Sequence, residues 1–254
     1  MKEQLISLCN DDALEISFAP GSGKNAVVSF AGIGLNFGGM QTEEFAKSLE
    51  STTSDVYYVK DKLRHWYTEC ADKIVEIVNR HLQARNIANT TCIGNSMGGF
   101  GAVYFAPRLL NCRNAIAFVP QSSINTRLVP WETRWKEWRA GLVPGEGLDA
   151  VQTLDPGVSY TIIIGLKEHR DILHVRRLIT KAPDSMIAIG LPKSGHGAAA
   201  HLKRESLLKP FLRALLAGQK EAALTALQET DHEILNARNI KAFVIAARTR
   251  RDKR

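Results

Sequence analysis

The chain has 254 residues, of which 44% are hydrophobic, and it carries a formal net charge of +7. A chain of this length and composition can bury the core of one sizeable globular domain. No apolar run approaches the roughly 20 residues that a membrane span requires. The N-terminus lacks the long apolar stretch of a secretory signal, so the sequence argues against membrane-spanning and secreted proteins.

Strands and helices are predicted to alternate along the chain. The expected strands cover residues 14–18, 26–30, 56–59, 91–93, 115–119, 160–164 and 186–189. The expected helices cover residues 42–49, 68–84, 98–110, 172–182 and 198–216. Residues 219–235 look helical but separate, because Gly218 is a break before them. This order is typical of an α/β protein with a mostly parallel central sheet flanked by helices.

Residues 121–157 interrupt the alternation and are the natural place for a cap over a site. Trp131, Trp135 and Trp138 are spaced as on one face of a helix, and the first two are candidate substrate-binding residues. Their rings could hold an acyl chain or stack on a sugar. The alternative is that they only attach the cap to the body. The segment also carries three arginines that could bind an anionic group: Arg127, Arg134 and Arg139. We expect them to be solvated, as arginines on such a segment usually are.

The positive charge is concentrated at the C-terminus. Seven basic residues and one aspartate lie from residue 238 onward, a net of +6, so the other 237 residues carry only +1. Apolar residues follow the spacing of an amphipathic helix at Ile240, Phe243, Val244 and Ala247. We expect a docked helix with a solvated end. The alternative is a basic contact for an acidic partner, nucleic acid or an anionic membrane.

The four cysteines are widely spaced and include no Cys-x-x-Cys pair: Cys9, Cys70, Cys92 and Cys112. Such cysteines are typical of reduced, mostly buried thiols. The sequence therefore predicts a cytoplasmic protein.

The most informative motif is Gly-Asn-Ser-Met-Gly-Gly at residues 94–99, between a predicted strand and a predicted helix. Gly-x-Ser-x-Gly in this context is the nucleophile elbow, a tight turn that holds a serine, here Ser96, above the sheet. The N-terminus of the following helix points at the place where an oxyanion would need stabilisation. The pattern alone is common by chance, and its alternative is a glycine-rich turn.

The order of residues along the chain supports the elbow, which needs an acid and then a histidine after later strands. Glu168 and Asp171 follow the strand at 160–164, and His196 follows the strand at 186–189. The carboxyl ends of parallel strands meet at one edge of a sheet, where ligands bind. We therefore expect Ser96, one of the two acids, and His196 to meet there.

An oxyanion hole is expected from two main-chain N–H groups. One is that of Met97, directly after the serine. The other is that of Ile33, within Ala-Gly-Ile-Gly at residues 31–34, which follows the strand at 26–30. The alternative is a flexible glycine loop with no such role.

These motifs resemble those of the α/β-hydrolase superfamily. The matching segments are residues 31–34, 94–99, 165–168 and 194–196, and the resemblance spans about residues 14 to 217. The stretch from Ser96 to Ala102 looks like the elbow of serine esterases of the esterase D kind. The resemblance implies an α/β-hydrolase domain at 1–217, with the cap at 121–157. A C-terminal helical extension with the basic tail then follows at 218–254.

The resemblance also implies a function. We expect a serine hydrolase that cleaves a small-molecule carboxylic ester or thioester through an acyl-enzyme on Ser96. One alternative is an acyltransferase that uses the same triad. The other is a non-catalytic binding or assembly protein, because fold does not fix function.

Two features depart from the superfamily. Ala31 replaces a histidine of the oxyanion loop, which matters little because the donors are backbone groups. Glu168 stands where the superfamily usually carries aspartate, three residues after the strand-ending Gly165. We expect Glu168 to be the acid for its spacing and reach. Asp171, the competitor, would cap the following helix.

Four histidines in one region raise the question of a metal site: His169, His174, His196 and His201. The spacings 169/174 and 196/201 are both i, i+5, which does not place two imidazoles on one helix face. We therefore expect no metal and no cofactor.

Overall fold

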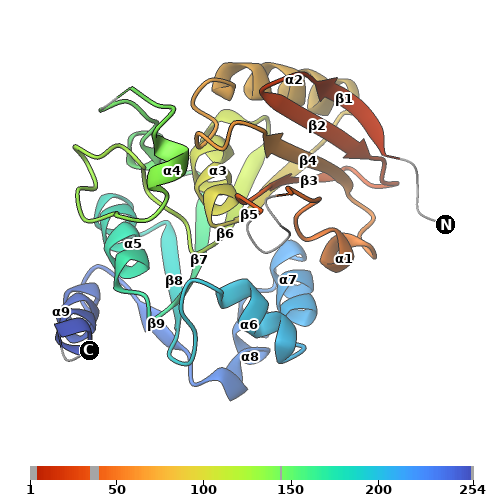
Figure 1. Cartoon of the computed structure of the whole chain (residues 1–254). Coiled ribbons are helices and arrows are strands. Elements are labelled where there is room, and N and C mark those ends of the chain that lie inside the picture. Colours follow the sequence, from red (N-terminus) through yellow and green to blue (C-terminus); the bar gives the residue numbers. More distant parts are fainter. Residues whose placement is uncertain (1–4, 35–39, 144, 253–254) are drawn as a thin grey trace.

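The structure is a computed structural model that describes residues 5–34, 40–143 and 145–252. Among these residues one sheet of nine strands has the order β1-β2-β4-β3-β5-β6-β7-β8-β9 (Figure 1). The strands are β1 (Ile6–Asn10), β2 (Leu14–Ala19), β3 (Asn25–Phe30), β4 (Asp55–Asp61), β5 (Asn89–Asn95), β6 (Cys112–Phe118), β7 (Ser159–Gly165), β8 (Met186–Leu191) and β9 (Glu233–Leu235). Six neighbouring strands run parallel, namely β4, β3, β5, β6, β7 and β8. β1, β2 and β9 are antiparallel to their neighbours. The expected mostly parallel α/β sheet is confirmed.

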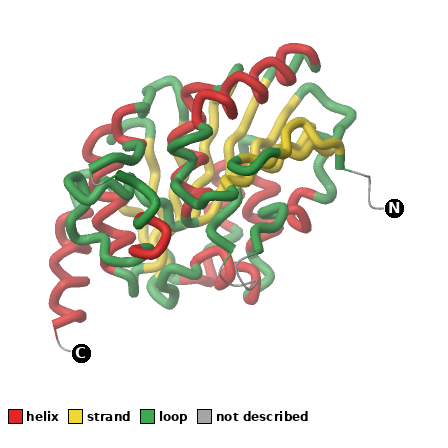
Figure 2. The backbone as a smooth tube through the Cα atoms, turned by 45° about the horizontal axis from the view of Figure 1, so that its top comes forward, coloured by secondary structure: helices red, strands yellow, loops and turns green. Residues whose placement is uncertain are grey.

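Helices lie on both sides of the sheet (Figure 2). They are α1 (Ala46–Leu49), α2 (Ala71–Ala84), α3 (Met97–Phe105), α4 (Lys136–Arg139), α5 (His169–Lys181), α6 (Ala198–Arg204), α7 (Leu208–Leu216), α8 (Lys220–Thr225) and α9 (Ile240–Asp252). Most residues of the central strands are buried because both faces of the sheet are covered. Phe30 of β3, for example, stacks on Phe105 of α3 with ring centroids 5.0 Å apart.

Two expected helices differ in the structure. The helix predicted at 198–216 is two helices, α6 and α7, separated by Ser206 in a left-handed conformation with a φ of 61°. The helix predicted at 42–49 is confined to α1. A left-handed serine between two helices gives no clear signal in the sequence, because only glycine and asparagine favour that conformation strongly.

The C-terminal segment contributes to the sheet as well as to the helical layer. β9 pairs antiparallel with β8, with Leu235 opposite Ala188, although the sequence favours helix throughout residues 219–235. α9 packs beside α5, and the side chains of Ile240, Val244 and Ala247 are buried. The docked amphipathic helix is thus confirmed.

Within the part of the chain that the structure describes, no helix combines the length and the apolar character needed to cross a bilayer.

Candidate active site

Ser96 forms the tight turn between β5 and α3, with a φ of 57° and a ψ of −117°. Serine rarely adopts this backbone conformation, which costs on the order of 1–3 kcal/mol and persists only where the surroundings impose it. The surroundings here are close backbone contacts. A β-carbon at Gly94 would lie 1.9 Å from the carbonyl oxygen of Gly98, and one at Gly98 would lie 2.0 Å from that of Phe30. The two glycines therefore let β3, β5 and α3 approach closely enough to form the elbow.

Replacement of Gly98 by alanine is expected to lower the free energy of unfolding by about 3 kcal/mol, at the upper end of overpacking costs, because backbone must move to admit the methyl group. The matched control is Gly195→Ala, where an added β-carbon meets no heavy atom of the described chain within 4 Å. Urea unfolding of both variants measures the difference. Equal stabilities would contradict the close approach of α3 to β3.

Ser96, His196 and Asp171 form a chain of hydrogen bonds. Ser96 Oγ lies 2.9 Å from His196 Nε2, and His196 Nδ1 lies 3.0 and 2.9 Å from the two oxygens of Asp171. The Asp171 side chain is fully buried, whereas His196 is about a quarter exposed. In this arrangement the imidazole can accept the serine proton while the carboxylate orients the ring and stabilises the imidazolium that forms.

The two candidate acids take the opposite places to those expected. Glu168 is the N-cap of α5, where its side chain accepts a hydrogen bond from the main-chain nitrogen of Arg170. It also pairs with the Arg170 guanidinium at 2.8 Å, and although burial opposes the shift, these bonds lower the pKa of Glu168. Asp171, rather than Glu168, meets His196. The expected contact was wrong because α5 begins at His169, three residues earlier than predicted, so the cap falls on Glu168.

A pocket of about 320 Å³ opens over Ser96 and His196. Ile33, Glu44 and Trp135 contribute to its lining, together with Gln41 and Asn95. Its walls are therefore mixed, with one indole and several polar side chains. Burial raises the pKa of Glu44, whose carboxylate lies 3.4 Å from the main-chain nitrogen of Gly32. No motif in the sequence points to this carboxyl group.

The tryptophans do not share one helix face. Trp135 has a left-handed backbone with a φ of 61° and precedes the short α4, so the predicted helix through 131–138 is wrong. The ring of Trp135 lies near that of His196, with centroids 5.5 Å apart. Trp131 lies instead beside His174, and Trp138 lies below the guanidinium of Arg64. Of the two candidate substrate-binding indoles, only that of Trp135 is among the described residues that line the pocket.

The loop after β3 is held from both sides of Ile33. The side-chain amide of Gln41 donates to the carbonyl oxygen of Gly32 at 2.8 Å, and Arg64 Nε donates to that of Ile33 at 3.1 Å. Because a trans peptide places its N–H opposite its carbonyl, the bond from Gln41 fixes the direction of the Ile33 N–H. Met97 is the first residue of α3, so its N–H belongs to the positive end of the helix dipole.

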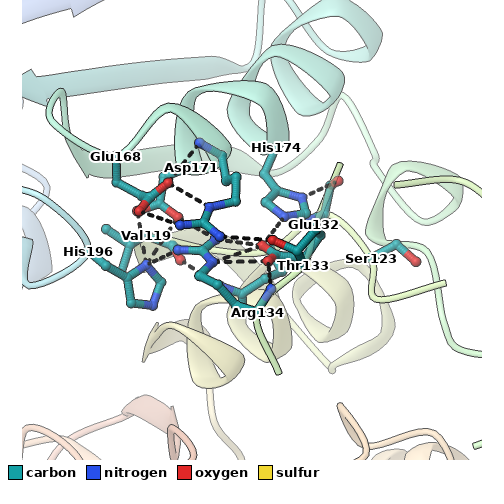
Figure 3. A network of polar contacts seen from close by, with 12 residues as sticks. Val119, Ser123, Glu132, Thr133, Arg134, Glu168, Asp171, His174 and His196 are labelled. Atoms are coloured by element: carbon teal, nitrogen blue, oxygen red, sulfur yellow. Dashed lines mark hydrogen bonds and ion pairs between the residues drawn. The ribbon is translucent and has the colours of Figure 1, made fainter. Parts of the chain in front are cut away.

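A buried network continues from Asp171 into the segment 121–157 (Figure 3). Arg134 donates to Asp171 Oδ1 at 2.9 Å and to Glu132 Oε2 at 2.6 Å. His174 Nε2 lies 3.1 Å from the same oxygen of Glu132. Although burial opposes the shift, the hydrogen bonds from His174 and Arg134 hold the pKa of Glu132 well below its usual range. The sequence predicts a solvated arginine here, yet only 13% of the Arg134 side chain is exposed.

The protonation of His174 follows from its partners. The main-chain N–H of Ser122 donates to His174 Nδ1 at 3.1 Å, so Nδ1 is the acceptor and Nε2 carries the ring proton, with which it donates a hydrogen bond to Glu132. Burial also lowers the pKa of His174, which keeps the ring neutral. Among the described residues, no three His, Cys, Asp or Glu side chains are grouped so that they could hold a metal ion.

A family model described as "Putative esterase" matches residues 39–200, more than half of the chain. No curated protein sequence matches the chain.

Solved structures with similar folds include enzymes of more than one kind. The capsule O-acetyltransferase of Neisseria meningitidis serogroup A, in a mutant form in complex with CoA, has 14% identity and a TM-score of 0.60 over 84% of this chain and 94% of that chain. The Pyrococcus horikoshii acylaminoacyl peptidase has 15% identity and a TM-score of 0.57, and the match covers 84% of this chain but only 41% of the peptidase chain. Est1E from Butyrivibrio proteoclasticus has 11% identity and a TM-score of 0.52, and the match covers 88% of this chain and 98% of the Est1E chain. At these identities the likeness shows an α/β-hydrolase fold.

Proposed function

The chain belongs to this esterase family, and on that premise we propose that it is a serine esterase with Ser96, His196 and Asp171 as its catalytic triad. The observation that carries the proposal is the unbroken chain of hydrogen bonds from Ser96 Oγ through the imidazole to a buried carboxylate. A serine hydroxyl is a weak nucleophile unless a base of this kind is positioned beside it.

In the proposed reaction, Ser96 Oγ attacks the carbonyl carbon of an ester or thioester while His196 Nε2 takes the hydroxyl proton. The main-chain N–H groups of Met97 and Ile33 hold the oxyanion, helped by the dipole of α3. His196 then returns the proton to the leaving alcohol or thiol, which leaves an acyl group on Ser96. Water, activated by His196, attacks this acyl-enzyme and releases the acid. Asp171 stabilises the imidazolium in both halves of the reaction.

The pocket supports a small-molecule substrate. Its volume of about 320 Å³ is at the lower end of the range for small-ligand pockets. Trp135 is the proposed contact for the acyl or leaving group, because its ring lies beside His196. For Trp131 the proposed role is to attach the insertion to the body, through its contact with the buried His174.

Acyl transfer is the second candidate, favoured by the O-acetyltransferase that shares the fold. The two reactions differ only in what reaches the acyl-enzyme. A panel of acetyl, butyryl and thioester substrates, assayed with and without added alcohol, separates them. A hydrolase yields free acid in proportion to substrate consumed, whereas a transferase yields a new ester and turns over faster with the acceptor. Consumption of none of these substrates by folded protein would contradict both candidates.

Three further assignments are part of the proposal. The hydrolase domain is residues 1–217 with the insertion 121–157, and residues 218–254 are an extension of it. The cytoplasm is the proposed location, supported by the free Cys9, Cys70, Cys92 and Cys112. An acidic partner for the tail is supported by the exposed positions of Arg238, Lys241 and Arg248.

A further inference from the structure

Arg134 is placed to act on the triad from outside it. One of its terminal nitrogens, Nη2, bonds both Asp171 and Glu132, and the other, Nη1, lies 3.1 Å from His196 Nδ1 (Figure 3). Both carboxylates are fully buried. Arg134 thus joins the insertion 121–157, on which it lies with Glu132, to the acid and the base of the proposed triad.

The charges of Asp171, Glu132, Arg134 and His174 add up to a net charge that suits the reaction. Asp171 and Glu132 each bring one negative charge, Arg134 brings one positive charge, and His174 is neutral. One negative charge is therefore left beside His196, and the imidazolium formed during catalysis neutralises it. Without Arg134 the buried carboxylates of Glu132 and Asp171 would lose the cation that both of them contact, and an uncompensated buried charge is strongly unfavourable.

Arg134 also touches the imidazole, but it acts on it through Asp171. Both oxygens of Asp171 lie within 3.0 Å of His196 Nδ1, so this nitrogen carries the ring proton and donates a hydrogen bond to the carboxylate. A guanidinium has only donors, so the 3.1 Å approach of Arg134 Nη1 to His196 Nδ1 is a packing contact rather than a hydrogen bond. The bond that Arg134 donates to Asp171 at 2.9 Å is therefore the one that fixes the partner of the imidazole.

We propose that Arg134 is a positioning residue of the catalytic site, which holds the Asp171 carboxylate in place against His196. This proposal rests on the proposed function, because it concerns the same triad. It makes assembly of the site depend on the insertion, because a displacement of residues 132–134 would release Asp171 and leave the imidazole without a fixed partner.

The test compares Arg134→Gln with a matched control, Arg170→Gln. Arg170 pairs with Glu168 at 2.8 Å and donates to Thr133 of the insertion at 3.1 Å, so it also joins a carboxylate of α5 to the insertion, but its carboxylate is not the one that meets His196. The readout is the rate at which a fluorophosphonate labels Ser96 at one fixed pH, which requires no knowledge of the natural substrate.

We expect Arg134→Gln to lower the labelling rate about 10- to 100-fold, because the acid and base lose their fixed geometry. Arg134→Lys keeps the charge but reaches one carboxylate at a time, so it should label faster than Arg134→Gln and more slowly than the wild type. Arg170→Gln should match the wild-type rate.

Chemical rescue separates positioning from a purely structural role. In Arg134→Gly, guanidinium chloride at low millimolar concentration should restore part of the labelling rate, whereas urea, which is neutral and similar in shape, should not. A wild-type rate in Arg134→Gln would overturn the proposal. So would a loss of rate in Arg134→Gly that guanidinium does not restore. Failure of the wild type itself to label would overturn the proposed function, and this inference with it.

Discussion

Replacement of Ser96 by alanine should abolish ester hydrolysis, with a fall in kcat of about 10⁶-fold. No other group takes over the attack on the carbonyl carbon once the hydroxyl is gone. The turn itself should persist, because its backbone conformation is imposed by the close contacts at Gly94 and Gly98, and alanine has the same β-carbon as serine. We therefore expect a change in unfolding free energy within about 1 kcal/mol.

Initial rates with 4-nitrophenyl acetate, together with urea unfolding of the same preparation, measure both quantities. Ser29→Ala serves as the control, because Ser29 is a buried serine of β3 that bonds the main chain of Glu44. It should lose some stability and keep its activity. Activity retained in a folded Ser96→Ala protein would show that the reaction uses another nucleophile.

The second large effect is expected from Asp171→Asn, with a fall in kcat of about 10⁴-fold. The asparagine side chain can turn its NH₂ group toward His196 Nδ1. The imidazole would then carry its proton on Nε2, where it cannot accept the proton of Ser96. Glu168→Gln should change kcat less than about tenfold, because Glu168 caps α5 and pairs with Arg170. Its expected effect is a loss of stability of about 1 kcal/mol.

Side-by-side kcat values for the two variants decide between the acids, and urea unfolding confirms that both are folded. The reverse ranking, with Glu168→Gln the more damaging, would restore the assignment that the sequence favours and contradict the contact between Asp171 and His196.

Much of the fold was predictable because several central strands contain a run of buried apolar residues. β7, with three consecutive buried isoleucines, is the clearest case. The edges of the sheet were not predicted. β1 is half exposed with no clean alternation, and β9 has only three residues, so its partner β8 determines it rather than its own composition. Local propensity is weak at such edges, where tertiary contacts decide.

The site was predictable where chain order and turn chemistry constrain it. Ser96 and His196 follow strands β5 and β8, which end at the same edge of a parallel sheet, so their meeting at that edge could be predicted. The choice of acid depended on where α5 begins, and helix boundaries read from a sequence are uncertain by about the three residues that separate Glu168 from Asp171. The place of Arg134 depended on how the insertion folds back over the sheet. The sequence of the insertion has no periodic pattern from which the course of its backbone could be predicted.

The central claim is that Ser96 is activated by His196. We would test it by mass spectrometry of the intact protein after incubation with a fluorophosphonate, beside the Ser96→Ala and His196→Ala variants. A single adduct on Ser96 of the wild type, absent from both variants, is the expected result. An unlabelled wild type that is folded, or labelling that persists without His196, would contradict it.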